Sequence, residues 1–426
     1  MKRHSLILIA SAALATGLLA ACSPGGTTGT GTQPPGSPAP VTITFWDAYS
    51  EGGQEVNTLE KTIIPAFEAA NPNITVQDVT VPYDDLHQKL ITGTAGGQLP
   101  DLVRSDIIWV PELANLGVLA PLDTTMSNFQ DLSSQVFPGT LSTNKWKDHY
   151  YGLPLDTNTL ALLYSPKNFS SWGLTVPTTW DELKADAPAL KAKGVYAYSD
   201  TGLSGWNILP VIWSFGGSIT DSNVTKATGY LNSPQTVAAI QYLYDMYQAG
   251  YIPKNLTTAN DDNSPGFATG QFATIPGGPW MFSILNGQYP NFDLTATAMP
   301  SGPGGSVSVV GGEDVVMTAS SQHKDAAAKF ITYLLSTDSQ MAMAQVGQMP
   351  VLSSLSSQMA QLQPYYATFV QQLTTAQARP ATPAWNEIDT ALSTTLQNLF
   401  IKGGNVQQTM DTLAGQVDQL LAKYTS

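Results

Sequence analysis

Tryptophan and tyrosine are abundant in this sequence, and several tryptophans stand beside Gly, Pro or acidic residues at positions predicted to be loops. The chain has 9 Trp and 17 Tyr among 426 residues, and only 12% of its residues are charged. An aromatic face suits the C–H face of a sugar ring, while nearby Asp, Asn, Glu or Arg side chains can bond its hydroxyl groups. Each tryptophan taken singly more often belongs to a core, but a position at a strand end favours a ligand site. The five places are Trp46-Asp47, Asp106 to Trp109, Gly205 to Asn207, Gly277 to Trp280, and Pro383 to Asn386.

Motifs for covalent or metal chemistry are missing. The four histidines are scattered without paired spacing, and Cys22 is the only cysteine, so we expect no zinc or iron site. The sequence has neither a phosphate-binding GxxxxGK[ST] loop nor a GxSxG nucleophile motif. Ser321 to Lys324 matches S-x-x-K, but the companion motifs are absent. We therefore predict no catalytic residue, no metal and no cofactor.

The charge balance excludes one large class of partners. The formal net charge is −14 at pH 7. Binding to nucleic acid requires clustered Lys and Arg that neutralise phosphates, and this chain has no such cluster. A polyanion is a poor candidate ligand.

The N-terminus has the pattern of a targeting segment. Lys2 and Arg3 precede the apolar stretch 6–19, and small residues lead to Cys22. This pattern resembles a bacterial lipoprotein signal, which implies cleavage before Cys22 and lipidation of its thiol. An ordinary signal peptide with an incidental cysteine is the alternative. We expect a signal peptide over 1–21, a lipidated Cys22 with a flexible Gly/Pro/Thr-rich linker over 22–40, and a location outside the cytoplasm on the bacterial cell membrane.

The rest of the chain alternates strand and helix patterns. Apolar runs predict strands at 41–46, 74–80 and 101–106, and residues at helical spacing predict helices between them. This β-α-β-α-β order indicates an α/β protein with a mostly parallel sheet. A capping box at Thr179 to Glu182 and the Ser233-Pro234 pair predict two further helix starts. Helical patterns also cover 326–335, 385–401 and 405–424.

A family resemblance rests on a series of segments in a fixed order. They are ITFW (43–46), FEAANPNITV (67–76), LPDLVRSD (99–106), LGVLAPLD (116–123), YGLPLDTNTLALLYSPKNF (151–169), VPTTWDEL (176–183), Gly216-Gly217, NSPQTVAAIQYL (232–243), FATGQFATIPGGPW (267–280), KDAAAKFITYLLS (324–336), GQMPV (347–351) and RPATPAW (379–385). Together they resemble the extracellular solute-binding proteins of ABC importers, family 1, which includes maltodextrin-binding proteins.

The resemblance implies a two-lobed periplasmic-binding-protein fold of type II. Each lobe would be a mostly parallel sheet flanked by helices, and hinge strands would join the lobes. Lobe 1 would comprise 41–155 plus 300–350, and lobe 2 would comprise 156–299 plus 351–426. A ligand would lie in the cleft and close the lobes on itself.

The resemblance also implies a set of ligand-binding residues. Trp280 of the GGPW segment would be the main stacking platform. The full set is Trp46, Asp47, Tyr83, Asp84, Arg104, Ser105, Asp106, Trp109, Asp156, Asn158, Trp206, Trp280, Gly312, Glu313, Asp314, Arg379 and Trp385.

The implied function is capture of a di- or oligosaccharide by a monomer, without catalysis, and delivery to two transmembrane subunits of an ABC permease. Two alternatives stay open. The first is the same fold with a non-sugar ligand such as a polyamine, which would fit the acidity of the chain. The second is a surface carbohydrate-active enzyme, for which the separation of two carboxylates would be the criterion.

Overall fold

The computed structural model describes residues 39–49, 53–258 and 262–424. The chain divides into two units, Met1–Ala39 and Pro40–Ser426, and the second unit contains the elements discussed below. The predicted signal peptide, Cys22 and nearly all of the predicted linker lie outside the described residues. In the part of the chain that the structure describes, no helix is both long and apolar enough to cross a bilayer.

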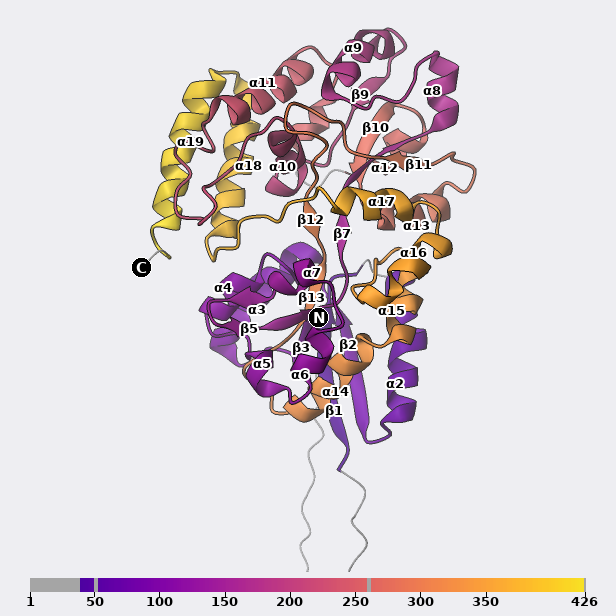
Figure 1. Ribbon diagram of the computed structural model, residues 1–426, viewed down its shortest axis with the longest axis vertical. Helices are drawn as coiled ribbons and strands as arrows, with labels where there is room; N and C mark the ends of the chain where they lie inside the picture. Colours follow the sequence, from indigo (N-terminus) through magenta and orange to yellow (C-terminus); the bar gives the residue numbers. More distant parts are fainter. Residues whose placement is uncertain (1–38, 50–52, 259–261, 425–426) are drawn as a thin grey trace, which may run out of the picture. The chain divides into compact units, whose positions relative to one another are not determined.

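A five-stranded sheet forms the centre of the first lobe (Figure 1). Its strand order is β2-β1-β3-β13-β6, and β1 pairs in parallel with both β2 and β3, which confirms the β-α-β-α-β prediction. The strands are β1 (Val41–Asp47), β2 (Ile74–Thr80), β3 (Leu102–Asp106), β6 (Gly152–Pro154) and β13 (Glu313–Met317).

Helices cover both faces of this sheet because its strands are apolar on both sides. Ile43 and Phe45 of β1 pack in one cluster with Phe330 of α14, whereas Trp46 packs in the opposite cluster with Leu86 of α3. The helices and short strands of this lobe are α1 (Gln54–Thr58), the π-helical turn η1 (Leu59–Ile63), α2 (Ile64–Ala70), α3 (Tyr83–Gly96), α4 (Val110–Asn115), α5 (Leu122–Thr125), α6 (Phe129–Ser133), α7 (Pro138–Ser142), β4 (Lys145–Trp146), β5 (His149–Tyr150), α14 (Lys324–Leu334), α15 (Thr337–Ala344) and the 3-10 turn η3 (Ser353–Leu355).

The second lobe has a four-stranded sheet of order β11-β8-β10-β9. The predicted capping box is present at its helix α9, where the Glu182 N–H donates to Thr179 Oγ1 at 3.0 Å. Ser233 caps α11 as predicted. The elements are β8 (Ala161–Tyr164), α8 (Pro166–Trp172), α9 (Trp180–Lys191), β9 (Tyr196–Tyr198), α10 (Gly205–Ser214), α11 (Pro234–Gln248), η2 (Lys254–Thr257), α12 (Ser264–Ala268), β10 (Phe272–Gly277), α13 (Trp280–Gln288), β11 (Thr295–Thr297), α16 (Ser356–Leu362), α17 (Tyr366–Leu373), α18 (Trp385–Lys402) and α19 (Val406–Leu421).

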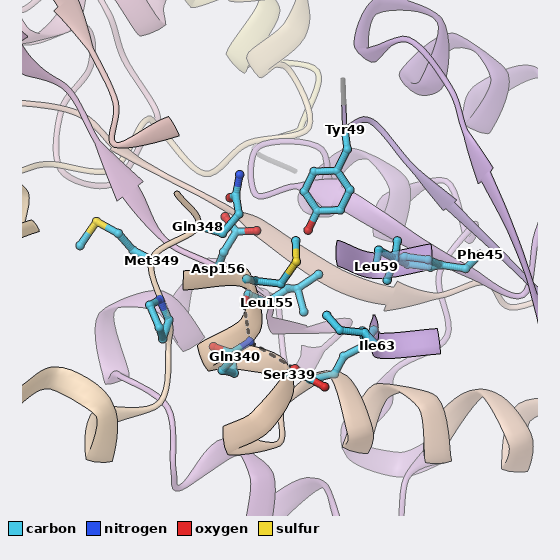
Figure 2. A pocket seen from close by; sticks show the side chains of 13 residues that line it. Phe45, Tyr49, Leu59, Ile63, Leu155, Asp156, Ser339, Gln340, Gln348 and Met349 are labelled. Carbon is cyan, nitrogen blue, oxygen red and sulfur yellow. Dashed lines mark hydrogen bonds between the residues drawn. The ribbon is translucent and has the colours of Figure 1, made fainter. Parts of the chain in front are cut away.

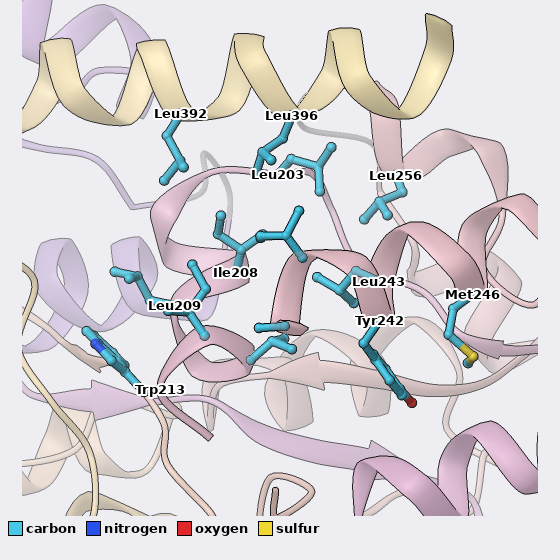
Figure 3. Packing of buried hydrophobic residues seen from close by; sticks show 14 of the residues in the cluster. Leu203, Ile208, Leu209, Trp213, Tyr242, Leu243, Met246, Leu256, Leu392 and Leu396 are labelled. Atoms are coloured by element: carbon cyan, nitrogen blue, oxygen red, sulfur yellow. The ribbon is translucent and has the colours of Figure 1, made fainter. Parts of the chain in front are cut away.

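The largest apolar cluster holds the C-terminal helices against the second lobe. Figure 3 shows Leu392 and Leu396 of α18 packing over Ile208 of α10 and Leu243 of α11. All four side chains are buried. The helices α18 and α19 are therefore part of this lobe's core, and α18 can position side chains at the edge of the lobe.

The sheets are less parallel than the sequence predicted. In the first lobe β13 runs antiparallel to β3 and β6, and in the second lobe β8 runs antiparallel to β10 and β11. Among the strand pairs of the second-lobe sheet, β9 and β10 run in parallel. The reason for β13 is topological. This strand enters the first lobe from the second, at the edge where β3 ends, so it must run in the opposite direction.

Two short antiparallel strands cross between the lobes. These are β7 (Asn158–Thr159) and β12 (Val310–Gly311), which pair with each other and lie side by side in Figure 1. The chain was predicted to return to the first lobe at residue 300. It returns later, because Val307 and Val309 are buried in the second lobe's cluster. The chain was also predicted to leave the first lobe at residue 351. It leaves later, since the buried Leu355 packs with the first lobe.

Candidate functional site

A cleft of about 460 Å³ lies between the lobes, at the end of the first-lobe sheet where β1 and β3 finish. This volume falls in the range of pockets that bind small molecules. Open α/β sheets commonly place ligands at this edge. Its lining comprises Ala48, Tyr49, Glu55, Tyr83, Arg104, Asp106, Ile108, Asn158, Thr201, Ser204, Trp206, Asn207, Trp280, Ile284, Gly311, Gly312, Glu313, Gln348, Arg379 and Asp389.

Arg104 organises the first-lobe wall. Its Nη2 lies 2.7 Å from Glu313 Oε2 and 3.0 Å from Asp156 Oδ2, and its guanidinium carbon lies 4.0 Å from the centre of the Tyr49 ring. Arg104 and Asp156 are buried. Burial raises the pKa of the Glu313 carboxyl, and the Arg104 charge opposes that rise. The positive charge of Arg104 is therefore compensated by carboxylates of the protein itself.

A second ion pair joins the two lobes. Arg379, from the loop before α18, places Nη2 3.3 Å from Asp106 Oδ1 at the end of β3. The Tyr83 hydroxyl donates to Asp106 Oδ2 at 2.7 Å, and the Ile108 N–H donates to Asp106 Oδ1 at 2.9 Å. Both oxygens of Asp106 are therefore occupied. Arg379 also lies over Trp206, with 5.2 Å from its guanidinium carbon to the ring centre.

Two tryptophans form the second-lobe wall. The rings of Trp206 on α10 and Trp280 on α13 lie 6.4 Å apart with an interplanar angle of 32°. Gly278 makes room for one of them, since a Cβ at this position would lie 1.9 Å from Trp280 Cζ3. Gly311 does the same for the other, because a Cβ there would lie 2.5 Å from Trp206 Cη2. The glycines of the GGPW segment and of the crossing strand thus allow the aromatic surface to form.

Polar groups below the tryptophans are bonded to one another. Asp200 is buried, and it accepts hydrogen bonds from the Tyr198 hydroxyl at 2.9 Å and from the Asn207 amide. Burial raises the pKa of the Asp200 carboxyl to about 7, because the donors around it are neutral. Ser204 Oγ donates to Asn207 Oδ1. These bonds fix the loop that leads into α10 and therefore the position of Trp206.

A small cavity of about 20 Å³ is lined by Tyr49, Asp156 and Gln348 together with apolar residues of the first lobe (Figure 2). Gln340 of α15 connects the chain segments around it. Its Nε2 donates to the Leu155 carbonyl at 2.8 Å, and its Oε1 accepts from the Val351 N–H at 2.9 Å. Leu155 precedes the crossing strand β7, and Val351 belongs to the first-lobe cluster. Gln340 thus holds the start of this crossing to the first lobe.

The structure brings part of the predicted site together in the cleft. Those lining residues are Tyr83, Arg104, Asp106, Asn158, Trp206, Trp280, Gly312, Glu313 and Arg379. Asp156 lies behind them, bonded to Arg104. Asp84 belongs to α3, but its side chain lies outside what the structure describes.

Several predicted residues lie elsewhere. Ser105 and Asp314 are buried and point to the opposite face of the sheet, since neighbouring strand residues alternate. Asp314 accepts from Asn144 Nδ2 at 2.7 Å. Buried Asp47 holds the loop after β1 by accepting from the Tyr49 N–H at 2.8 Å.

The other predicted site residues that lie outside the cleft are tryptophans that belong to hydrophobic clusters. Trp46 packs against the cluster that contains Trp109. Trp109 lies behind Tyr83, with ring centres 4.9 Å apart, and is buried. Trp385 is buried in the second lobe, at the start of α18. Ring type and loop position alone did not distinguish these three from Trp206 and Trp280.

Sequence reasoning missed some lining residues. Among these, Tyr49 and Glu55 flank the loop after β1, Gln348 belongs to the GQMPV segment, and Asp389 follows Trp385 by one helical turn. Asp389 gave no usable signal, because Trp385, one helical turn before it, is buried in the second lobe rather than in the cleft. Glu55 gave no signal beyond its place near a helix start.

The described parts of the chain contain no group of three or more His, Cys, Asp and Glu side chains placed to hold a metal ion.

A family model for bacterial extracellular solute-binding proteins matches residues 52–341 of the chain. A binding protein of Brucella abortus (strain 2308) is 29% identical over 373 residues, covering 84% of this chain and 88% of its own. The multiple sugar-binding protein of Streptococcus mutans is 27% identical over 314 residues, covering 67% and 70%. The crystal structure of an ABC transporter solute-binding protein from Thermotoga lettingae, bound with alpha-D-tagatose, superposes with a TM-score of 0.80 at 25% identity, covering 89% of this chain and 99% of its own.

Proposed function

The chain belongs to the bacterial extracellular solute-binding protein family, and on this premise we propose that it captures a di- or oligosaccharide in the interlobe cleft and delivers it to the transmembrane subunits of an ABC permease. The observation that carries the proposal is the pairing of the Trp206 and Trp280 wall with a facing wall of carboxylate and guanidinium groups. A sugar presents apolar C–H faces and hydroxyl edges, which match these two walls. The relatives named above as sugar-binding support the same ligand class.

The contacts proposed for the ligand follow from this arrangement. Trp280 stacks on a sugar ring, because Arg379 already lies over Trp206. Asn158, Glu313 and the nearby carboxylate Asp389 bond to hydroxyl groups. The protein changes no covalent bond of the ligand and acts as a monomer without a cofactor.

A thermal-shift panel tests the ligand class. A ligand that binds only the folded protein raises its melting temperature in proportion to the logarithm of concentration over Kd. We expect at least one neutral or substituted di- or oligosaccharide to raise Tm, and polyamines and peptides to leave it unchanged. A rise with spermidine alone would replace the sugar by a polyamine. Chromatography of the released ligand should return it intact, and a cleaved product would indicate an enzyme.

Membrane attachment through Cys22 is part of the proposal and rests on the sequence pattern of residues 1–22. Two acyl chains hold a protein on a bilayer where one is marginal. We expect Cys22→Ala to release the protein from washed membranes while its sugar affinity stays the same. Retention of the variant in the membrane fraction would contradict lipidation at this residue.

A further inference from the structure

Glu55 is a buried cleft carboxylate that the protein leaves unpaired. It lies in the first turn of α1, is only 8% exposed and lines the cleft. Across residues 39–49, 53–258 and 262–424, no hydrogen bond or ion pair to its side chain is present, and the ion pairs of the cleft arginines go to other carboxylates. Its carboxylate oxygens remain open to water in the cleft. A ligand that fills the cleft displaces this water, and burying the carboxylate is then costly unless the ligand supplies a partner.

The charges around the cleft do not balance. Its lining includes four carboxylates, those of Glu55, Asp106, Glu313 and Asp389, but only two guanidinium groups, and no lysine of the described chain lines it. Both arginines are already bound to carboxylates. Arg104 is bound to Glu313 and to Asp156, which lies behind the cleft lining, and Arg379 is bound to Asp106. A narrow cleft between low-dielectric walls concentrates the field of such an excess. An anionic ligand is therefore disfavoured, and a cationic group gains from the same field.

From these two observations we infer that the cleft is selective for a saccharide that carries a basic nitrogen, with its ammonium group facing Glu55, over the neutral sugar of the same size and linkage. This inference rests on the proposed function. A hydroxyl group would donate a hydrogen bond to Glu55 but leave its charge uncompensated. An ammonium group donates a hydrogen bond and also compensates the charge. The Trp280 ring in the same cleft also favours a cation over its face.

Calorimetry with matched saccharides tests the inference. Each series contains three disaccharides of the same linkage: one of glucosamine, one of glucose and one that carries a uronic acid. One series is α-1,4-linked and the other is β-1,4-linked. We expect the amine to bind roughly 10-fold more tightly than its neutral counterpart in one series, a gap of about 1.4 kcal/mol, and the uronic acid not to bind. Equal or tighter binding of the neutral sugar overturns the inference and leaves the proposed function intact. Binding by no saccharide in either series also overturns the inference, whereas the proposed function is overturned only if no di- or oligosaccharide raises Tm in the thermal-shift panel.

A conservative variant locates the effect. Glu55→Gln keeps the shape of the side chain and removes its charge, so we expect it to remove most of the preference for the amine while the neutral sugar changes by less than about 2-fold, a difference of roughly 0.4 kcal/mol. Glu60→Gln is the matched control, because Glu60 lies on the adjoining turn η1, is exposed and does not line the cleft. A preference unchanged in Glu55→Gln, with both variants melting as the parent does, overturns the role of Glu55.

Discussion

The two walls of the cleft are held by different kinds of interaction. The first-lobe wall consists of charged groups whose positions depend on ion pairs centred on Arg104 and Asp106. The second-lobe wall is dominated by two tryptophans beside Arg379 and Asp389, and Asp200, buried behind the loop into α10, accepts from three neutral donors. A charge can be buried only with its partner, whereas an aromatic ring needs only space and a firm backing. Substitutions that break the ion pairs of the first wall should therefore affect folding, and substitutions of the tryptophans in the second wall should affect binding.

The largest expected effect is the loss of the central charge of the first wall. Arg104→Met would leave buried Asp156 and partly buried Glu313 without a cation, and breaking a buried pair such as Arg104–Asp156 costs about 3–5 kcal/mol. We expect a clearly lower urea midpoint for this variant. An unfolding curve that matches the parent's would mean that the carboxylates are neutral and that the wall does not depend on charge.

The buried acid of the second wall predicts a pH dependence of stability. The Asp200 carboxyl has a pKa of about 7 when folded, against 3.8 as its ordinary value. A raised acid pKa favours the protonated folded state, so the contribution is complete below pH 4 and is lost as the pH rises through 7. With about 1.4 kcal/mol per pKa unit, the loss is up to about 4 kcal/mol.

The matching variant is Asp200→Asn, which cannot ionise. Its free energy of unfolding, measured by urea titration between pH 4 and 7.5, should fall less with pH than that of the parent protein. Parallel pH profiles for the two proteins would show that Asp200 keeps an ordinary pKa despite its burial.

Trp280→Ala tests the binding role of the second wall. Removal of a stacked ring from a desolvated site should weaken sugar binding by about 1–3 kcal/mol, measured by calorimetry. The urea midpoint should change less than in Arg104→Met, since Trp280 is only partly buried. Trp172→Ala is the control, because Trp172 packs on Phe169 and does not line the cleft. Equal loss of affinity in both variants would remove Trp280 from the site.

The smallest effect concerns the contact that joins the walls. Asp106 and Arg379 belong to different lobes and lie within 3.3 Å, so their substitutions should not act independently. In a double-mutant cycle on sugar affinity, with Asp106→Asn and Arg379→Gln, we expect a coupling above ~0.5 kcal/mol. Additive losses would show that the walls contribute to closure separately.

The elements around these walls were largely predictable. Period-2 and helical spacing located β1, β2, α3 and β3, and the capping box located the start of α9. These signals are local, because a strand or a helix start depends on residues within a few positions of one another. The antiparallel course of β13 was not predictable in this way, because it depends on the lobe from which the chain arrives.

The sequence by itself determined which chemical groups the cleft could use: abundant tryptophan, a large excess of acid over base, and the ordered segments that place the chain in its family. Only the tertiary structure decided which of these groups face the cleft. Trp280 follows Pro279, Trp385 follows Pro383-Ala384, and both begin helices, yet one lines the cleft and the other is buried in the core. The difference comes from segments distant in sequence: α10 and its neighbours cover Trp385, whereas Gly347 lies against the backbone of Trp280 and leaves its ring on the cleft. The pairing of Arg379 with Asp106, 273 residues apart, arises in the same way.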